Sequence, residues 1–150
     1  MIISIPIQDF NKECIYFGDY IKNIVIQNSF FIRLFYSTEH LTINGIYITF
    51  PIVIENIEKS YNNRIIFHYK QDENRKVFEK IMEMEEDIIK KINITNKTPE
   101  FSIRKLFLNN HIKIYDQRKD YGKTVLFNCK ISGIWDNGDH YGLTFKINVL

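Results

Sequence analysis

The sequence predicts an α+β fold that is mainly β: a small antiparallel barrel or curved sheet with one long helix over about residues 74–92. Three observations predict it. Most segments alternate apolar and polar residues with the period of a strand, one segment changes to helical spacing, and strands then resume. With 150 residues, 45% apolar and 25% charged, the chain is long and apolar enough for one globular domain over residues 1–150 and is not wholly disordered.

Three strands are predicted before the helix. Residues 29–37 are rich in β-branched and aromatic residues, and residues 41–54 place apolar side chains on one parity. Pro51 indicates an edge position or a strand break within the second strand. Asn62 and Asn63 form a turn signal before the third strand, over residues 64–70.

The predicted helix has apolar residues at helical spacing. They are Phe78, Ile81, Met82, Ile88, Ile89 and Ile92. Asp72 or Asn74 can cap the start, and Lys90 and Lys91 suit the negative end.

Glu85 falls at the centre of the apolar stripe of this helix. A buried carboxylate is costly unless it is paired or hydrogen-bonded. We therefore expect Glu85 to be at least partly buried beside a Lys, Arg, Tyr or backbone donor; the alternative is that the helix projects past the core there.

Strands return in the last third of the chain. A helical turn is predicted near residues 103–108, a short strand over 111–115 and a longer one over 124–135 with a bend or bulge at Gly133. Asn137-Gly138 is a hairpin signal before a final, half-buried strand that alternates over residues 143–149.

This order of elements is shared by the OB-fold, a five-stranded barrel that carries its helix between the third and fourth strands. Counting residues 29–37, 41–54 and 64–70 as the first three strands puts the helix over 74–92 in that place. The sequence therefore predicts an OB-like domain.

No catalytic or metal-binding motif is present. The four histidines have no metal-ligand spacing, and no nucleophile elbow, phosphate-binding loop or dinucleotide fingerprint occurs. Cys14 and Cys129 are too few for a disulfide framework or for a zinc site without histidine, and Cys129 lies on the apolar parity of its strand. We expect a protein that is not an enzyme and uses no cofactor and no metal.

Charge is distributed unevenly along the chain. The formal net charge is only +2, but residues 101–150 carry eight bases and four acids, while acids concentrate over residues 72–87 of the helix. A one-sided field suits a polyanion that lies on one face. An ordinary mixed surface is the alternative.

Aromatic and basic residues occur together on one strand and in one loop. Phe31, Arg33 and Phe35 share one parity of their strand, an arrangement in which rings stack on bases and the cation contacts phosphates. The alternative is a strand buried on both faces. Trp135, the one tryptophan, either closes the core, which we favour, or offers a stacking surface. We predict that the strand face and the loop form one surface for nucleic acid, with these contact residues: Phe31, Arg33, Phe35, Lys113, Tyr115, Arg118, Lys119 and Lys123.

Several segments resemble the OB-fold single-stranded DNA-binding-like proteins of large DNA viruses and phages. The opening Ile3-Ser-Ile-Pro-Ile-Gln-Asp-Phe-Asn is similar to their N-terminal segment, and the helix over residues 77–92 is similar to the helix after their third strand. The most distinctive similarity is at the end, in Ile131-Ser-Gly-Ile-Trp and Tyr141-Gly-Leu-Thr-Phe-Lys. The absence of alanine from the chain, with its abundance of Ile, Asn and Lys, is typical of AT-rich genomes, which include those of some large DNA viruses.

The resemblance implies a non-enzymatic viral protein that coats single-stranded DNA, or RNA, in replication or recombination. Its expected partners are the nucleic acid, other viral replication proteins and further copies of itself. The alternative function is a protein–protein interaction module in virion structure or assembly. With no apolar run of about 20 residues and no basic signal segment at the start, we expect no membrane contact and a site of action inside the cell, in the host cytoplasm or nucleus.

Overall fold

The computed structural model describes residues 3–118 and 120–150. The fold is α+β and mainly β, with 48% strand and 24% helix, as predicted. The strands are β1 (Ile5–Pro6), β2 (Ile15–Lys22), β3 (Phe30–Ser37), β4 (Thr42–Asn44), β5 (Ile46–Val53), β6 (Asn56–Lys59), β7 (Arg64–His68), β8 (Thr98–Glu100), β9 (His111–Tyr115), β10 (Thr124–Asp136) and β11 (His140–Val149). The two α-helices are α1 (Arg75–Ile92) and α2 (Ser102–Phe107), and short 3-10 turns cover Ile7–Asp9, Lys12–Cys14, Tyr61–Asn63 and Asp72–Asn74.

The long strand β10 organises the larger, eight-stranded sheet. One side of β10 pairs with β11 along its length; the other side pairs with β5 through Ile131 and then with β3 from Gly133. A register shift at the predicted Gly133 bulge separates the two halves. Beyond them, β2 pairs with β3, the short β4 adds to the other end of β3, and β1 and β8 add short parallel pairs.

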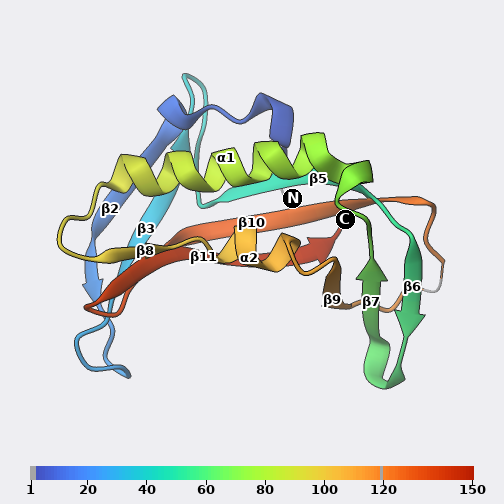
Figure 1. Ribbon diagram of the computed structural model, residues 1–150. Helices are drawn as coiled ribbons and strands as arrows, with labels where there is room; N and C mark the ends of the chain where they lie inside the picture. The colour runs from blue at the N-terminus through green and yellow to red at the C-terminus, as the bar shows by residue number, and fades with distance from the viewer. Residues whose placement is uncertain (1–2, 119) are drawn as a thin grey trace.

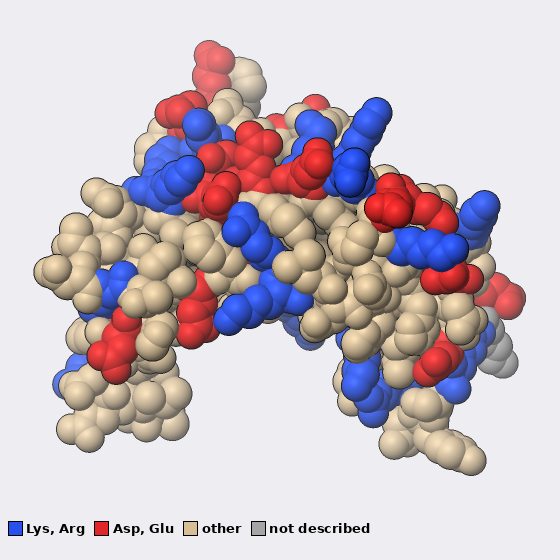
Figure 2. Space-filling model, viewed as in Figure 1, with Lys and Arg blue, Asp and Glu red and all other residues tan. Residues whose placement is uncertain are grey.

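The smaller sheet is an antiparallel meander in which β7 lies between β6 and β9. Figure 1 shows α1 lying over the larger sheet, with β2 and β3 descending at one end and β6, β7 and β9 at the other. The space-filling view in Figure 2 shows the resulting arched outline, which is hollowed between these two ends.

Strand alternation explains the core. Ile46, Ile48, Phe50 and Ile52 of β5 are all buried, as their shared parity predicts, and they face the α1 side of the sheet with Phe127 and Cys129 of β10. Pro51 does not break β5. Because β1 pairs only with Ile48 and Thr49, Pro51 lies where one edge of β5 is free.

The helix α1 begins and ends close to the predicted limits. Asn74 is its N-terminal boundary residue, but its side chain bonds β5 instead of the helix: it accepts from the Val53 N–H at 2.8 Å and donates to the Val53 carbonyl at 3.1 Å. Lys90 and Lys91 lie in the last turn, and Asn93 ends the helix in a left-handed conformation with φ of 49°.

Glu85 is buried and bonded as predicted. Its carboxylate is 0% exposed and accepts hydrogen bonds from the backbone N–H groups of Ile103 and Arg104, each at 2.9 Å. These N–H groups belong to the first turn of α2, which has no partner for them inside the helix. Glu85 therefore caps α2 from the neighbouring helix and fixes the two helices together.

Two expectations about the strands are corrected by the structure. Strands β1, β2 and β6 were not predicted, and the strand expected over residues 41–54 is divided into β4 and β5. The helix α1 therefore follows seven strands and does not follow the third. The strands that the structure describes also form open, strongly curved sheets without closing into a barrel. In addition, neither described α-helix is long and apolar enough to span a bilayer.

Candidate nucleic-acid interface

The face of the larger sheet that points away from α1, here called the open face, carries three of the predicted site residues. Ile32 and Leu34 of β3 are buried toward α1, and alternation turns Phe31, Arg33 and Phe35 to the open face. Arg33 is exposed, whereas the two rings are partly exposed. The prediction that these three side chains share one face is confirmed, and the alternative of a strand buried on both faces is wrong.

The three aromatic rings on this part of the open face each cover a glycine. A Cβ atom at Gly133 would come within 2.7 Å of the Phe31 ring, and one at Gly18 within 3.2 Å of the Phe35 ring. A ring packed against a glycine covers bare backbone. Phe31 and Phe35 are also only partly buried, so each ring keeps some surface exposed on the open face.

Trp135 forms the third such pair. Its strand partner on β11 is Gly142, and its indole ring lies 3.1 Å from the position that a Cβ atom at Gly142 would occupy. Its strand partner on β3 is Phe31. The expectation that Trp135 closes the core is therefore wrong: because the bulge at Gly133 shifts the alternation of β10, Ile134 and Asp136 face the core and Trp135 faces away from it.

Cations continue the open face along β10. Lys130 lies opposite Tyr47 of β5 on one side and Lys146 of β11 on the other. The Lys130 Nζ atom is 5.6 Å from the centre of the Tyr47 ring, close enough for a cation–π contact. Together with Arg33 these lysines place three cations beside the aromatic residues.

Acidic groups are excluded from this part of the open face. Strands β3, β5 and β11 contain no Asp or Glu, and the single acid of β10, Asp136, is buried with its side chain toward the core. The acids gather instead on α1, which covers the opposite face of the sheet; Figure 2 shows them, with several lysines and arginines, along the top of the view. Phosphates would therefore meet a positive potential on the open face.

Asn128 adds an unsatisfied polar group in the middle of the open face. It is 5% exposed, lies between Thr49 and Asn148 in the strand register, and its Oδ1 atom has no hydrogen-bond partner among the described residues. Buried side-chain oxygens are usually bonded.

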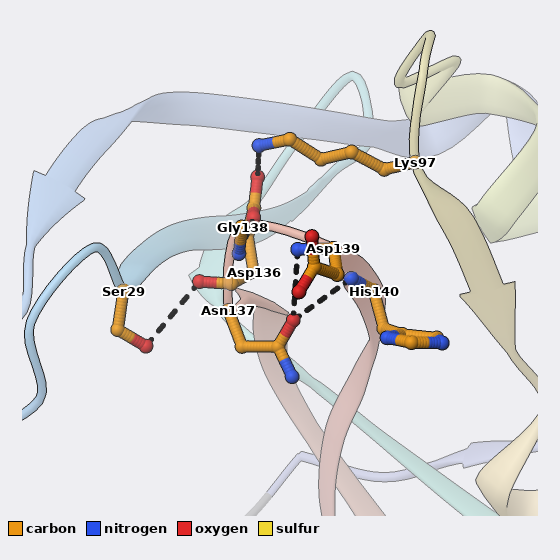
Figure 3. Close-up of polar contacts among 7 residues, drawn as sticks. All are labelled: Ser29, Lys97, Asp136, Asn137, Gly138, Asp139 and His140. Carbon is orange, nitrogen blue, oxygen red and sulfur yellow. Dashed lines mark hydrogen bonds and ion pairs between the residues drawn. The ribbon is translucent and has the colours of Figure 1, made fainter.

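A buried ion pair fixes the aromatic end of the open face (Figure 3). Asp136, which is 0% exposed, accepts a hydrogen bond from Lys97 Nζ at 2.6 Å and another from the Gly138 N–H at 2.9 Å. Its carbonyl accepts from the Ser29 hydroxyl at 3.3 Å. These contacts join the β10–β11 turn, the start of β3 and the segment before β8, and they hold the neighbouring Trp135 in place.

The predicted basic residues of the last third lie at the other end of β10. Lys113 and Tyr115 are exposed on β9 of the smaller sheet, and Lys123 is exposed just before β10 begins. Lys123 lies ten positions before Gly133, the strand partner of Arg33, which is roughly 30 Å along the strand at about 3.3 Å per residue. The structure therefore does not bring the two predicted groups into one compact patch. Lys119 lies outside the described residues.

Arg118 is engaged in local contacts. Its guanidinium lies 2.8 Å from Asp116 and donates to the carbonyl of Leu150 at 2.6 Å. Burial alone would raise the pKa of Asp116, but hydrogen bonds from Tyr121 and Arg118 outweigh it and hold the pKa below its ordinary value. Burial and Asp116 together raise the pKa of Tyr121 to about 12. These contacts tie Arg118 and Tyr121 to Asp116.

The structure adds Tyr47, Asn128, Lys130, Trp135 and Lys146 to the predicted interface. Their signal was present in the sequence: they occupy the parity opposite to the core-facing residues of their strands once the Gly133 bulge is counted. Among residues 3–118 and 120–150, no three His, Cys, Asp or Glu side chains are grouped so that they could hold a metal ion. Cys14 and Cys129 are both free thiols.

No protein-family model matches the chain, no curated protein matches it, and no solved structure matches it.

Proposed function

We propose that this protein binds single-stranded nucleic acid on the open face and performs no catalysis. The observation that carries the proposal is the association of three glycine-backed rings with Arg33, Lys130 and Lys146 on strands that carry no acid toward that face. Single-strand binders combine these two elements, because rings stack on any base and cations contact the phosphates.

The biological role that we propose is coating single-stranded DNA, or RNA, during viral replication or recombination, in the cytoplasm or nucleus of the host cell. A curved sheet that offers an aromatic and basic face, with a helix on the opposite side, is compatible with an OB-like binding mode. The resemblance of the chain's segments to viral single-stranded DNA-binding-like proteins supports the same role.

Two substitutions separate stacking from phosphate contact. Phe35→Ala should weaken binding of a single-stranded oligonucleotide by about 1–3 kcal/mol, with little change in salt dependence. Lys146→Ala should weaken binding and flatten the slope of log affinity against log salt by about 0.7, the value for one phosphate contact on a single strand. Lys80→Ala, an exposed lysine of α1, is the matched control and should change neither quantity.

Binding is measured by fluorescence anisotropy over a salt series, after urea unfolding has confirmed that each variant is folded. If folded Phe35→Ala and Lys146→Ala variants bind as tightly as the parent protein, the open face is not the binding surface.

A protein–protein interaction module is the second candidate. It is favoured by three consecutive aliphatic residues in the β2–β3 loop, where Ile24 is 97% exposed, Val25 87% and Ile26 56%. A parent protein that binds no oligonucleotide at low salt would favour this function, because an apolar interface does not depend on phosphate contacts.

A further inference from the structure

Strand β2 is an open edge of the larger sheet. Among the described strands it pairs only with β3, so the backbone groups along its other side have no strand partner. Apolar side chains along this edge are exposed: Tyr16 is 56% exposed, Tyr20 53% and Ile21 46%. An uncovered edge with exposed apolar residues is a template for pairing with another strand.

The loop that follows β2 is held in a fixed shape. The Asn23 Oδ1 atom accepts hydrogen bonds from the N–H groups of Val25 at 2.9 Å and Ile26 at 3.3 Å, and the Asn23 N–H donates to the Ser29 carbonyl at 2.8 Å. Ser29 in turn bonds to the backbone of Asp136. The end of the β2 edge is therefore already ordered, which reduces the entropy lost when a partner binds.

We propose that β2 pairs antiparallel with β2 of a second copy of this chain, with Ile21 on the two-fold axis. A two-fold axis that relates antiparallel strands of one sheet is perpendicular to the sheet, so the same face of each copy points the same way. Side chains of directly opposed residues also lie on the same face of an antiparallel pair. Both conditions are met only when one residue of β2 lies opposite the same residue of the second copy, so the register is centred on that residue. Tyr20, Ile21 and Lys22 form the regular stretch of β2, because the bulge between Phe17 and Tyr20 interrupts the pairing before it.

The chemistry of the side chains selects Ile21 as the central residue. With Ile21 on the axis, the Ile21 side chains of the two copies meet, and Tyr20 of each copy lies opposite Lys22 of the other, an aromatic–cation pair made twice. With Tyr20 on the axis, Asp19 would instead oppose the aliphatic Ile21. Self-complementarity of this kind favours a second copy over an unrelated peptide.

The pairing would join the open faces of the two copies. Ile21 lies opposite Phe31, which lies opposite Trp135, so the row of side chains Trp135, Phe31 and Ile21 would continue into the same row of the second copy in reverse order. The two curved sheets would then present one continuous surface. This inference does not depend on what the open face binds.

Cross-linking at the axis tests the proposal. Directly opposed residues of antiparallel strands have Cα atoms about 4.5–5.5 Å apart, within the range that a disulfide spans. In a Cys14→Ser background, Ile21→Cys should form a disulfide-linked dimer under mild oxidation much faster than Leu108→Cys, an exposed leucine after α2 that serves as control.

Sedimentation velocity provides the second measurement. The parent protein should sediment as a dimer at high concentration, and Ile21→Asp, which sets two like charges against each other on the axis, should sediment as a monomer. Leu108→Asp should leave the dimer intact, and circular dichroism checks that each variant is folded. A monomeric parent protein, a dimeric Ile21→Asp variant, or equal cross-linking at positions 21 and 108 would overturn the proposal.

Discussion

Replacing Glu85 with alanine should destabilise the protein by removing the contact that joins α1 to α2. The carboxylate is fully buried and accepts the N–H groups of Ile103 and Arg104, each at 2.9 Å. A buried N–H group left without an acceptor costs about 1–3 kcal/mol. Two such groups are orphaned, but the variant no longer buries a carboxylate, so we expect a net loss of about 2–4 kcal/mol in the free energy of unfolding.

Urea unfolding at pH 7 measures this loss. Glu83→Ala is the matched control, because Glu83 is an exposed acid on the same helix and its removal should change the free energy of unfolding by no more than about 0.5 kcal/mol. If Glu85→Ala is as stable as Glu83→Ala, then Glu85 does not cap α2 in solution.

The pH dependence of stability provides an independent check on Glu85. Burial raises the pKa of Glu85 above 4.5, and the hydrogen bonds from Arg104 and Ile103 offset only part of the increase. The folded protein thus holds this proton more tightly than the unfolded chain does. The stability that the protonated Glu85 contributes is fully present below the ordinary pKa of a glutamate. It is lost as the pH rises through the raised pKa of Glu85 in the folded protein. Glu85→Gln should remove this fall in stability, and an unchanged pH profile would contradict the assignment.

Three further substitutions or reactions test other contacts. Lys97→Ala should lower the free energy of unfolding by about 3–5 kcal/mol, because it leaves a fully buried carboxylate without its cation; urea unfolding measures it, and a neutral result would contradict the buried pair. Gly142→Ala should disturb both the pairing with β8 and the ring of Trp135, since the new Cβ atom would lie 2.9 Å from the Glu100 carbonyl oxygen and 3.1 Å from that ring. The fluorescence emission of Trp135 should shift, and an unchanged spectrum would contradict the packing of the ring on Gly142. Cys129 should react with a thiol reagent only on unfolding, because burial raises the pKa of its thiol, whereas the partly exposed Cys14 should react in the folded protein.

Local patterns in the sequence identified the elements whose periodicity is regular. The helix over residues 75–92, the Gly133 bulge and the Asn137-Gly138 turn were all predicted because each depends on neighbouring residues. Strand β2 was missed because its bulge interrupts the alternation, and β6 was missed because it has only four residues, most of them polar. Both depend on pairing with another strand to form.

The candidate site could be predicted only in part for a similar reason. Alternation within β3 was enough to place Phe31, Arg33 and Phe35 on one face. That Arg33 belongs with Lys130 and Lys146 depends on the register between β3, β10 and β11, which joins residues about a hundred positions apart. The same register places the loop before β10 at the far end of the strand, away from β3. Net charge in the last third could not reveal that separation.

The most direct test of the binding proposal uses Trp135, the single tryptophan of the chain, which lies on the open face. Its fluorescence is followed while a single-stranded oligonucleotide is added at a series of salt concentrations. We predict quenching on binding, and a log–log salt slope of about −2 if Arg33, Lys130 and Lys146 each contact one phosphate. Unchanged tryptophan fluorescence with no binding at low salt would contradict the proposal that the open face binds single-stranded nucleic acid.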